Sequence, residues 1–553
     1  MNLSAKDRSK SLERMKSETF DLAIIGGGIT GAGVARDAAS RGMRVALVEA
    51  SDFASGTSSR SSKLIHGGIR YLENFEFGLV FEALSERQKL FSMAPHLVHP
   101  LKFLIPVYKT GRVPAWKMGL GMFAYDALSL YEAPEMHEFL NPDDVHLDYP
   151  AIQTKDLSGG FTYYDAYMDD DRLVHETMRS AREWGAEIAN YTQVTGCQIG
   201  DGKIESLTCT DLENGESFSL KAKHFVGSVG PWTDLLGLNL FGDWKKRLRP
   251  SKGVHLTFLR ERFPLKDAVV MGAENRIVFA IPRHEMVIVG TTDTDFAKEP
   301  GEVKTEAEDV RYLLKVIEQY FPGAKITAKD IVGCYAGVRP LIDDGSQTES
   351  KTSREHEIWT DTRGVTFVAG GKYTTYRNMA RQTVEEVLRH FEIEDRVRFG
   401  RSQTAEPLNP LVTEDSLERA RREQQDWSRT YDLPVEVTAL LADRHGMEAR
   451  SILENFSRSK AIEPWQWLWS AEALHAVNKT MCLHLTDFYF RRTPLVLSRT
   501  DHGLPFARGI AEVMGESLGW SEEQKTAEFN ALQNQIQREL SATFSFDHDA
   551  PLT

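Results

Sequence analysis

Three glycines near the start of the chain, Gly26, Gly28 and Gly31, stand at the junction of two contrasting segments. An apolar run at 22–25 precedes them and an alanine-rich segment follows, which predicts a strand, a tight turn and a helix. In such a unit the first glycine permits the turn, the second lets a pyrophosphate approach the backbone, and the third lets the helix pack closely on the strand. The N–H groups at the start of the helix then stabilise the phosphates.

An acidic residue completes this pattern. A second apolar run, 45–48, ends in Glu49, which lies eighteen residues after Gly31. A carboxylate at the end of the second strand can bind ribose hydroxyls. The strand, the helix and the acid together predict a dinucleotide site, although their spacing does not separate FAD from NAD.

The stretch SSRSSKLIHGGIRYLE, residues 58–73, also carries groups that can do chemistry. Its first half supplies hydroxyls and two cations, and its second half has a histidine, His66, two glycines and an arginine. Three interpretations are open from the residues alone: a phosphate cradle, a covalent cofactor anchor at His66, or a polar loop.

Composition excludes several classes of protein. The 553 residues are enough for roughly three or four domains. The formal net charge of −14 argues against nucleic-acid binding, which needs a dominant basic field. The four cysteines are scattered and form neither a zinc spacing nor a CxxC pair, and the adjacent aspartates at 169–171 have no partner cluster. We therefore expect no disulfide scaffold and no metal.

The chain has no apolar core of signal-peptide length at its start and no run of about 18 apolar residues anywhere. This predicts a protein kept in the cytoplasm or lying on a membrane surface that faces it. The most apolar insert, 113–132, is too short and too polar to span a bilayer. It either lies in the membrane interface or packs on the protein's own core.

Hydrophobic periodicity suggests the elements that position these residues. Residues 74–92 are predicted to form an amphipathic helix, with Phe77, Phe81, Leu84 and Phe91 on its apolar face. Strand-rich segments are predicted at 99–108, 186–229 and about 252–292. Beyond about residue 400 amphipathic helices dominate, and the last one opens with a capping box, Ser521 to Gln524.

Eight segments together resemble the FAD-dependent glycerol-3-phosphate dehydrogenases, the aerobic, quinone-linked branch of the amino-acid-oxidase-like flavoproteins. They are IIGGGITGAGVARDAASRG, GTSSRSSKLIHGGIRYLE, YYDAYMDDDRLV, GPW, KGVHLTF, IVGTTDTD, AGVRPL and GGKYTTYR. The resemblance runs from about residue 20 to at least 380 and continues more weakly to the C-terminus.

This resemblance implies a fold of class α/β plus α. A Rossmann-like FAD-binding domain is interleaved with an antiparallel β-sheet substrate domain, and an α-helical C-terminal domain follows. The expected boundaries are a polar N-terminal tail at 1–18, FAD-binding parts at 19–98, 171–235 and 336–400, substrate parts at 99–170 (with the membrane-facing insert) and 236–335, and the helical domain at 405–553.

The implied activity is oxidation of sn-glycerol 3-phosphate to dihydroxyacetone phosphate. FAD is expected to be bound without a covalent link, which disfavours the anchor at His66. Electrons would pass to membrane quinone, from a peripheral position on the cytoplasmic face of the inner membrane. Two alternatives stay open: an oxidase that passes electrons to oxygen and makes hydrogen peroxide, and an FAD-dependent protein that modifies or binds nucleic acid. A homodimer is a further expectation.

The resemblance also assigns site residues. His255 is the expected general base, Arg339 and Lys372 complete the catalytic set, and the same two cations bind substrate with Arg70 and Tyr71. The expected FAD contacts are Gly26, Gly28, Gly31, Glu49, Thr57, Ser58, Ser59, Ser62, Lys63, Gly67, Gly68, Val194, Gly370, Gly371 and Thr374.

Each assignment has a plainer alternative that the residues alone favour. A lone histidine in a strand, such as His255, is more often a hydrogen-bonded core residue, and Arg339 could be salt-bridged at a sheet edge. The aspartates at 169–171 precede a helix, so we expect them to cap it and occupy its first turn. Arg491, Arg492 and the cations of the N-terminal tail are expected to be solvated.

Overall fold

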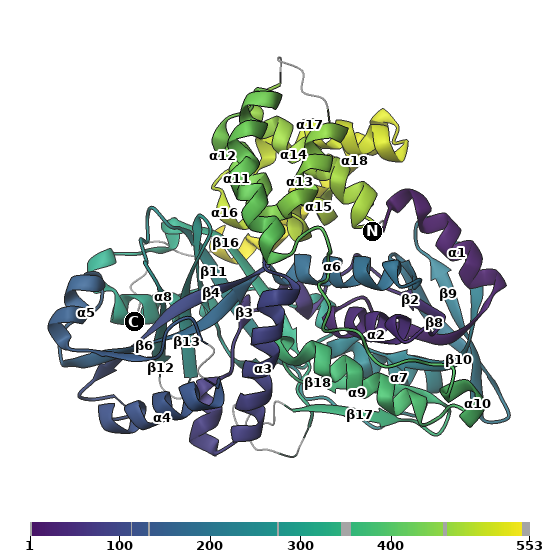
Figure 1. Cartoon of the computed structure of the whole chain (residues 1–553), viewed down its shortest axis with the longest axis horizontal. Coiled ribbons are helices and arrows are strands. Elements are labelled where there is room, and N and C mark those ends of the chain that lie inside the picture. The colour runs from purple at the N-terminus through teal and green to yellow at the C-terminus, as the bar shows by residue number, and fades with distance from the viewer. Residues whose placement is uncertain are drawn as a thin grey trace.

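Two β-sheets and a layer of helices make up the protein, and the chain passes repeatedly between the sheets (Figure 1). The computed structural model describes residues 3–111, 113–130, 133–273, 276–343, 345, 355–456 and 462–544. Of Arg70, Glu73, Asn74 and Phe544 it describes the backbone alone. The predicted fold class, two interleaved sheets followed by a helical part, is confirmed.

Five parallel strands form the centre of the first sheet, in the order β18–β10–β1–β2–β7. Strands β1 and β2 are almost wholly buried, as continuous apolar runs predict for a parallel sheet. The bounds are Thr19–Ile25 (β1), Val45–Val48 (β2), Glu187–Ala189 (β7), Ser217–Gly227 (β10) and Val365–Gly370 (β18), with antiparallel additions at Thr192–Gly200 (β8), Lys203–Asp211 (β9) and His356–Thr360 (β17).

The second sheet has the order β15–β11–β14–β13–β12–β4–β6–β3, with β16 paired to β11 and β5 to β6. Every pairing is antiparallel except that of β12 with β4. The bounds are Leu64–Ile65 (β3), Val98–Tyr108 (β4), Glu138–Leu140 (β5), Leu157–Met168 (β6), Ser251–Leu259 (β11), Ala268–Ala273 (β12), Arg276–Arg283 (β13), Met286–Gly290 (β14), Thr294–Asp295 (β15) and Ile331–Arg339 (β16). Because β16 continues to Arg339, it crosses the boundary predicted between 335 and 336.

Helices cover both faces of the first sheet. On one face lie α2 (Ile29–Ser40), α6 (Asp170–Glu183) and α9 (Tyr376–Leu388). On the other lie α7 (Thr233–Phe241) and α1 (Arg8–Ser17). α8 (Ala307–Tyr320) packs on the second sheet.

The N-terminal segment is not the solvated tail that its polar composition predicted. Leu12 and Met15 stand three residues apart on α1, so they form an apolar stripe that is buried against the first sheet. The Arg8 guanidinium is buried too and pairs with Asp211 at 2.6 Å. Ordered helix therefore replaces the expected tail, because two apolar residues and one arginine find partners in distant strands.

The C-terminal helices form one layer above both sheets in the view of Figure 1. The capping box at Ser521 is confirmed, with the Gln524 N–H donating to the Ser521 Oγ at 3.3 Å and the Ser521 N–H donating to the Gln524 Oε1 at 2.8 Å. The bounds are Glu414–Tyr431 (α11), Val435–His445 (α12), Ala449–Asn455 (α13), Pro464–Lys479 (α14), Leu485–Arg491 (α15), Leu495–Ser498 (α16), Leu504–Leu518 (α17), Glu522–Glu539 (α18) and Ser541–Phe544 (α19).

The three adjacent aspartates begin α6 as predicted, with Asp170 and Asp171 in its first turn. Asp169 precedes the helix, but its side chain makes no capping hydrogen bond. It forms ion pairs with Arg283 and, at 3.3 Å, with Arg172. The carboxylates therefore serve tertiary contacts as well as the helix terminus.

A buried carboxylate joins the helical layer to the first sheet. Asp52, which is 1% exposed and lies in the loop after β2, forms ion pairs with both Arg491 and Arg492. Burial raises the pKa of the Asp52 carboxyl, but the two guanidinium groups outweigh this and hold the pKa below its usual range. The prediction that Arg491 and Arg492 are solvated is therefore wrong.

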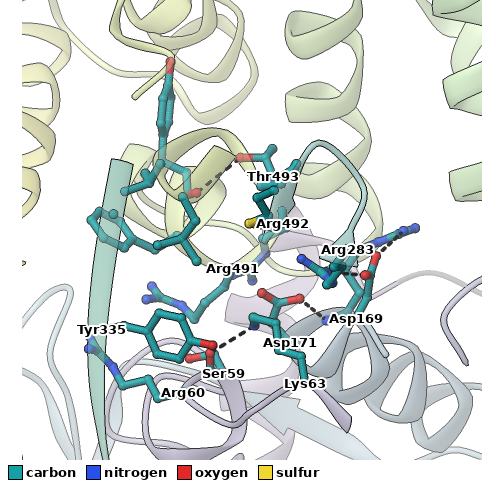
Figure 2. Close-up of a pocket in the computed structure, with 18 of the residues that line it drawn as sticks. Ser59, Arg60, Lys63, Asp169, Asp171, Arg283, Tyr335, Arg491, Arg492 and Thr493 are labelled. Atoms are coloured by element: carbon teal, nitrogen blue, oxygen red, sulfur yellow. Dashed lines mark hydrogen bonds and ion pairs between the residues drawn. The ribbon is translucent and has the colours of Figure 1, made fainter. Parts of the chain in front are cut away.

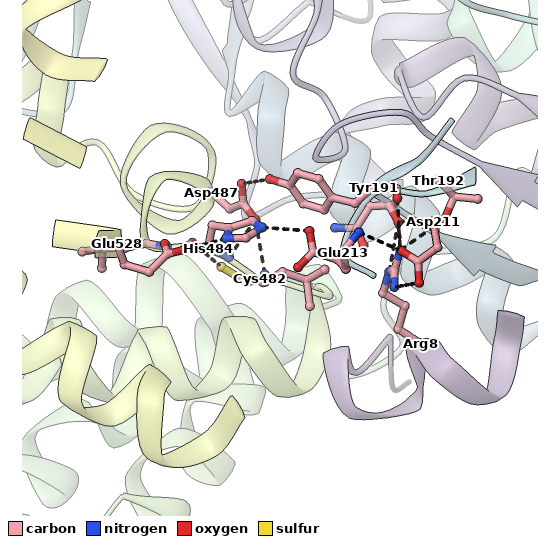
Figure 3. A network of polar contacts seen from close by, with 12 residues as sticks. Arg8, Tyr191, Thr192, Asp211, Glu213, Cys482, His484, Asp487 and Glu528 are labelled. Carbon is pink, nitrogen blue, oxygen red and sulfur yellow. Dashed lines mark hydrogen bonds and ion pairs between the residues drawn. The ribbon is translucent and has the colours of Figure 1, made fainter. Parts of the chain in front are cut away.

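A second network of polar contacts joins the C-terminal helical layer to the first sheet (Figure 3). The His484 ring, which stands before α15, lies between the carboxylates of Glu528 on α18, at 2.8 Å, and Glu213 in the β9–β10 turn, at 3.2 Å. Burial lowers the pKa of His484, but the two hydrogen bonds outweigh it and raise the pKa to about 11. The imidazolium therefore bridges the two acids.

Removal of the buried carboxylate should destabilise the protein strongly. Asp52→Ala leaves Arg491 and Arg492 buried without their counter-ion, so we expect the free energy of unfolding to fall by about 3 kcal/mol or more. Asp426→Ala, which removes a surface partner of Arg429, should change it by less than about 1 kcal/mol. Thermal and urea unfolding measure both variants.

The same ion pair predicts how stability depends on pH. Because the folded pKa of Asp52 lies below the unfolded value, its contribution is complete above about pH 4 and is lost as the pH falls through the folded pKa. Equal stability of Asp52→Ala and Asp426→Ala at neutral pH, where this contribution is complete, would contradict the role assigned to Asp52.

Candidate active site

The glycine turn has the close contacts that a pyrophosphate-binding turn requires. Gly26 adopts a φ of +110°, which favours glycine, at the point where β1 ends. A Cβ on Gly31 would lie 1.9 Å from the Gly26 carbonyl oxygen, so a larger residue cannot occupy that position without a shift of backbone. A Cβ on Gly28, at the start of α2, would lie 3.0 Å from the Ser58 Oγ. The cradle is therefore shaped by missing side chains, which fits the pyrophosphate of a dinucleotide.

Glu49 and Ser58 complete this turn. The Glu49 carboxylate accepts the N–H of Gly27 at 2.6 Å and that of Ser51 at 2.9 Å, while the Ser58 Oγ accepts the N–H of Ile29 at 3.0 Å. Burial raises the pKa of the Glu49 carboxyl and the backbone N–H groups oppose it. Glu49 thus stands at the predicted place, where its ribose contact stays a prediction.

Val194, predicted to contact the cofactor, lies on β8. It is partly buried and packs against the apolar core on one face of the first sheet. Two residues earlier, the Thr192 N–H donates to the Glu49 carbonyl at 2.7 Å. The contact of Val194 itself with the cofactor stays a prediction.

The loop 57–63 connects the turn to the second sheet. The Thr57 hydroxyl donates to a carbonyl of β16 at 2.6 Å, and the Ser62 Oγ lies 2.8 Å from the His255 Nε2. Lys63 forms a buried ion pair with Asp170. The expected contact of Lys63 with FAD stays a prediction.

His255 and Arg339 lie on one face of the second sheet. His255 of β11 pairs with Tyr335 of β16, and Ser251 of β11 pairs with Arg339 of β16. Because paired residues, and residues two apart, point to the same face of a sheet, these side chains share it. The structure therefore brings two of the predicted catalytic residues together from segments about eighty residues apart.

The His255 ring is tightly enclosed and uncharged. It is 2% exposed and stacks on Tyr335 with ring centroids 4.8 Å apart. Burial, helped by the charges of Arg339 and Lys63, lowers the pKa of His255 to about 3. Its Nε2 lies beside Ser62, and among the described residues its Nδ1 has no hydrogen-bond partner. The imidazole is therefore neutral near pH 7. So low a pKa makes it a weak base in this state, and an anion bound beside it would raise the pKa.

Lys372 and Tyr71, both predicted to bind substrate, are also in contact. The Lys372 Nζ lies 3.6 Å from the centroid of the Tyr71 ring, a cation–π contact. Lys372 follows Gly370 and Gly371, which adopt φ values of +77° and +79° at the end of β18. Glycine is favoured at both positions because other residues rarely adopt such φ values, and the FAD contacts expected of Gly370 and Gly371 stay a prediction.

The second half of the loop that contains His66 links these groups to the sheet. The His66 N–H donates to the Thr374 Oγ1 at 3.2 Å, and its ring lies edge-on to Phe279 at 6.5 Å. Phe279 pairs with Gly290, which pairs with His255. A series of contacts thus leads from Thr374, two residues after Lys372, through His66 and Phe279 to the strand pair that holds His255. The side chain of Arg70 lies outside the described residues, so its prediction is untested.

A buried group of polar side chains that was not predicted from the sequence contacts the backbone of Gly67. The Gly67 N–H approaches the Tyr125 Oη at 3.0 Å and the Asp165 Oδ1 at 3.3 Å. Asp165 pairs with Arg87 at 2.6 Å and accepts the Tyr125 hydroxyl. These residues come from three separate elements, so no local pattern could have grouped them.

A cavity of about 50 Å³ borders the site on the side of the helical layer (Figure 2). Ser59, Lys63, Arg283 and Arg491 line it, and burial raises the pKa of the Asp171 carboxyl there to about 6. Its size suits a few water molecules. Tyr335 lines it too, so one ring separates it from His255. Within the described ranges no cluster of three metal-ligating side chains occurs.

Comparisons with known proteins agree with this architecture. A family model described as FAD dependent oxidoreductase matches residues 21–377, and one described as C-terminal domain of alpha-glycerophosphate oxidase matches residues 414–525. The aerobic glycerol-3-phosphate dehydrogenase of Staphylococcus saprophyticus is 33% identical over 96% of this chain and 97% of its own length. The aerobic glycerol-3-phosphate dehydrogenase of Bacillus subtilis is 35% identical over 94% of this chain and 95% of its own length.

Solved structures give the same result. The glycerol-3-phosphate dehydrogenase of Bacillus halodurans, complexed with FAD, has a TM-score of 0.81 at 29% identity and covers 98% of this chain and 100% of that one. An L-alpha-glycerophosphate oxidase from Mycoplasma pneumoniae has a TM-score of 0.54 at 16% identity over 70% of this chain and 97% of its own, which shows the shared fold alone.

The fold, the glycine turn and the family match define an FAD-dependent oxidoreductase. Its cofactor is FAD, for which the turn provides the pyrophosphate cradle. The chain belongs to the family of aerobic glycerol-3-phosphate dehydrogenases.

The turn gives a direct test of FAD binding. Gly31→Ala places a Cβ against the Gly26 carbonyl, so we expect at least a tenfold loss of FAD affinity, which corresponds to about 1.4 kcal/mol. Gly196→Ala, in β8 where a Cβ meets nothing within 4 Å, should keep full FAD content. Flavin absorbance of the purified variants measures this, and equal FAD content would contradict the fit.

Proposed function

We propose that this protein oxidises sn-glycerol 3-phosphate to dihydroxyacetone phosphate. The observation that supports this most directly is the shared sheet face on which a neutral, buried His255 lies near the Arg339 guanidinium, beside the loop that leads from the glycine turn. The names of the full-length relatives support the substrate.

The residues divide the work as follows. Arg339 and Lys372 attract the phosphate dianion, because guanidinium and ammonium groups both bind phosphate. His255 accepts the proton of the C2 hydroxyl, and Ser62 holds the ring by its contact with Nε2. The bound FAD supplies a two-electron acceptor for the hydride of C2. The stacked Tyr335 ring keeps water away from the imidazole.

Anaerobic mixing with glycerol 3-phosphate tests the proposal. The flavin absorbance should bleach, since no second acceptor is present. His255→Gln should slow bleaching by about 10²- to 10⁴-fold while the FAD content stays unchanged. Absence of bleaching in the unaltered protein would refute the substrate, and unchanged rates in His255→Gln would refute the base.

We also propose that the reduced enzyme passes electrons to a membrane quinone while bound to the cytoplasmic face. The support is an apolar surface, which we define by Phe75, Phe77, Phe81, Trp116, Leu120 and Phe123; their exposed fractions are 78%, 45%, 44%, 70%, 63% and 57%. Phe75 lies just before α3 (Phe77–Met93), and the others lie on α3 and α4 (Ala115–Leu128), two helices in contact. Exposed apolar side chains gathered in this way are typical of an interaction site.

The two helices that carry this surface bear on two sequence expectations. Residues 115–128 form a helix, and Met122 and Tyr125 are its buried side while Trp116 faces outward. The apolar face predicted for α3 is confirmed at Leu84, which is buried, and is wrong at Phe77 and Phe81, which are half-exposed. α3 and α4 lie at the end of the molecule opposite the helical layer (Figure 1). Within the described residues no helix is long and apolar enough to cross a membrane.

Co-sedimentation with anionic vesicles tests the membrane proposal. The double variant Trp116→Ser, Phe123→Ser removes two aromatic side chains, so we expect a loss of vesicle binding with unchanged oxidation of glycerol 3-phosphate by a soluble dye. Trp465→Ser, which alters an exposed tryptophan of α14, should bind as the unaltered protein does. Equal binding by all three proteins would contradict this surface.

An oxygen-using oxidase is the second candidate. The observation in its favour is the match of residues 414–525 to a domain described from alpha-glycerophosphate oxidase. Hydrogen peroxide release in stoichiometric amounts, without quinone reduction, would favour this alternative.

A further inference from the structure

We propose that Asp293 is a positioning residue that holds the Arg339 guanidinium in place for the anionic group of the substrate. This inference rests on the proposed function and deepens it. Asp293 belongs to the segment GTTDTD, between β14 and β15, which contributed no residue to the predicted site.

The contacts around Arg339 form a cage of oxygen atoms. The Arg339 Nη1 donates to the Asp293 Oδ1 at 3.0 Å. The Nη2 donates to the Thr291 Oγ1 at 2.9 Å and to the Thr292 carbonyl at 3.2 Å. The Nη1 also donates to the Ser251 Oγ at 3.3 Å. Residues 291–293 therefore orient both terminal nitrogens, and Asp293 supplies a carboxylate to the charged guanidinium.

The Asp293 carboxylate is itself held rigidly. Asp293 is 7% exposed, and its Oδ1 also accepts the hydroxyl of Ser251, a fully buried residue, at 2.9 Å. Ser251 is the strand partner of Arg339. The carboxylate thus links β11 and β16 through a buried hydroxyl and cannot turn without loss of these bonds.

The backbone beneath the guanidinium is adapted to it as well. A Cβ on Gly253 would lie 2.5 Å from the Arg339 Nη2 and 2.6 Å from the Thr291 Oγ1. Gly253 does not adopt a positive φ, so its backbone conformation does not require glycine. The position requires glycine because a side chain would collide with the guanidinium. The Arg339 guanidinium therefore lies over Gly253, and its hydrogen bonds to Asp293 and Thr291 hold it there.

A held arginine binds an anion better than a mobile one. Its side chain loses little rotamer freedom on binding, and its fork already has the direction that the ligand requires. The paired carboxylate supplies this order without contact to the substrate. Loss of Asp293 should therefore weaken substrate binding through Arg339 and leave the proton-accepting step of His255 largely intact.

Steady-state kinetics with glycerol 3-phosphate tests the inference. Asp293→Ala should raise KM by about ten- to a hundredfold with a much smaller change in kcat, as loss of a charge-assisted hydrogen bond predicts. Asp293→Asn keeps an oxygen acceptor, so KM should return to within about threefold of the unaltered protein. In an Arg339→Ala background, Asp293→Ala should have no further effect.

Matched controls separate positioning from folding. Asp295→Ala, two residues away, removes an exposed partner of Arg249 and should leave KM unchanged. Gly253→Ala should raise KM as Asp293→Ala does, whereas Gly272→Ala, where a Cβ meets only the Tyr320 Oη at 3.6 Å, should not. FAD content and the unfolding midpoint are measured for every variant.

Three results would overturn the inference. They are an unchanged or lowered KM in Asp293→Ala, an equal rise of KM in the Arg339→Ala background, and an unchanged KM in folded, FAD-loaded Gly253→Ala. An unaltered protein that does not oxidise glycerol 3-phosphate would refute the proposed function instead, so the two failures are distinguishable.

Discussion

The buried carboxylate of Asp52 and its two arginine partners are the interaction on which the arrangement of the three layers depends. Asp52 lies between Glu49, at the end of β2, and the loop 57–63. Arg491 and Arg492 hold it from α15, so the helical layer fixes the path of the chain that joins the glycine turn to the second sheet. A charge of this kind is tolerated in the interior only when its partners are in place.

From this anchored loop the rest of the site follows. Thr57 reaches a carbonyl of β16, and Ser62 reaches His255 on β11. The antiparallel pairing of β11 with β16 then places His255 and Arg339 on one face. Burial at this face keeps the His255 imidazole neutral, and charges interact more strongly where water is excluded.

The elements with strong local patterns were predicted well. The strand, turn and helix around Gly26 and Gly31 and the capping box at Ser521 need only neighbouring residues, and the structure has them as expected. The amphipathic helix α3 was also predicted, and Leu84 of its predicted apolar face is buried, but Phe77 of the same face is half-exposed. Periodicity identifies an apolar stripe, whereas the neighbours decide which part of it is covered.

The sequence by itself determined the secondary structure of the cofactor turn, the fold class and the family, since these depend on local spacing and on motifs that can be recognised one at a time. Only the tertiary structure decided the partners of the charged side chains. Arg492 and Asp52 are 440 residues apart and were both unremarkable in sequence, and Arg339 finds Asp293 across 46 residues. Composition shows that charges are present, but the free energy of burying them is decided by which distant groups the fold brings within hydrogen-bond distance.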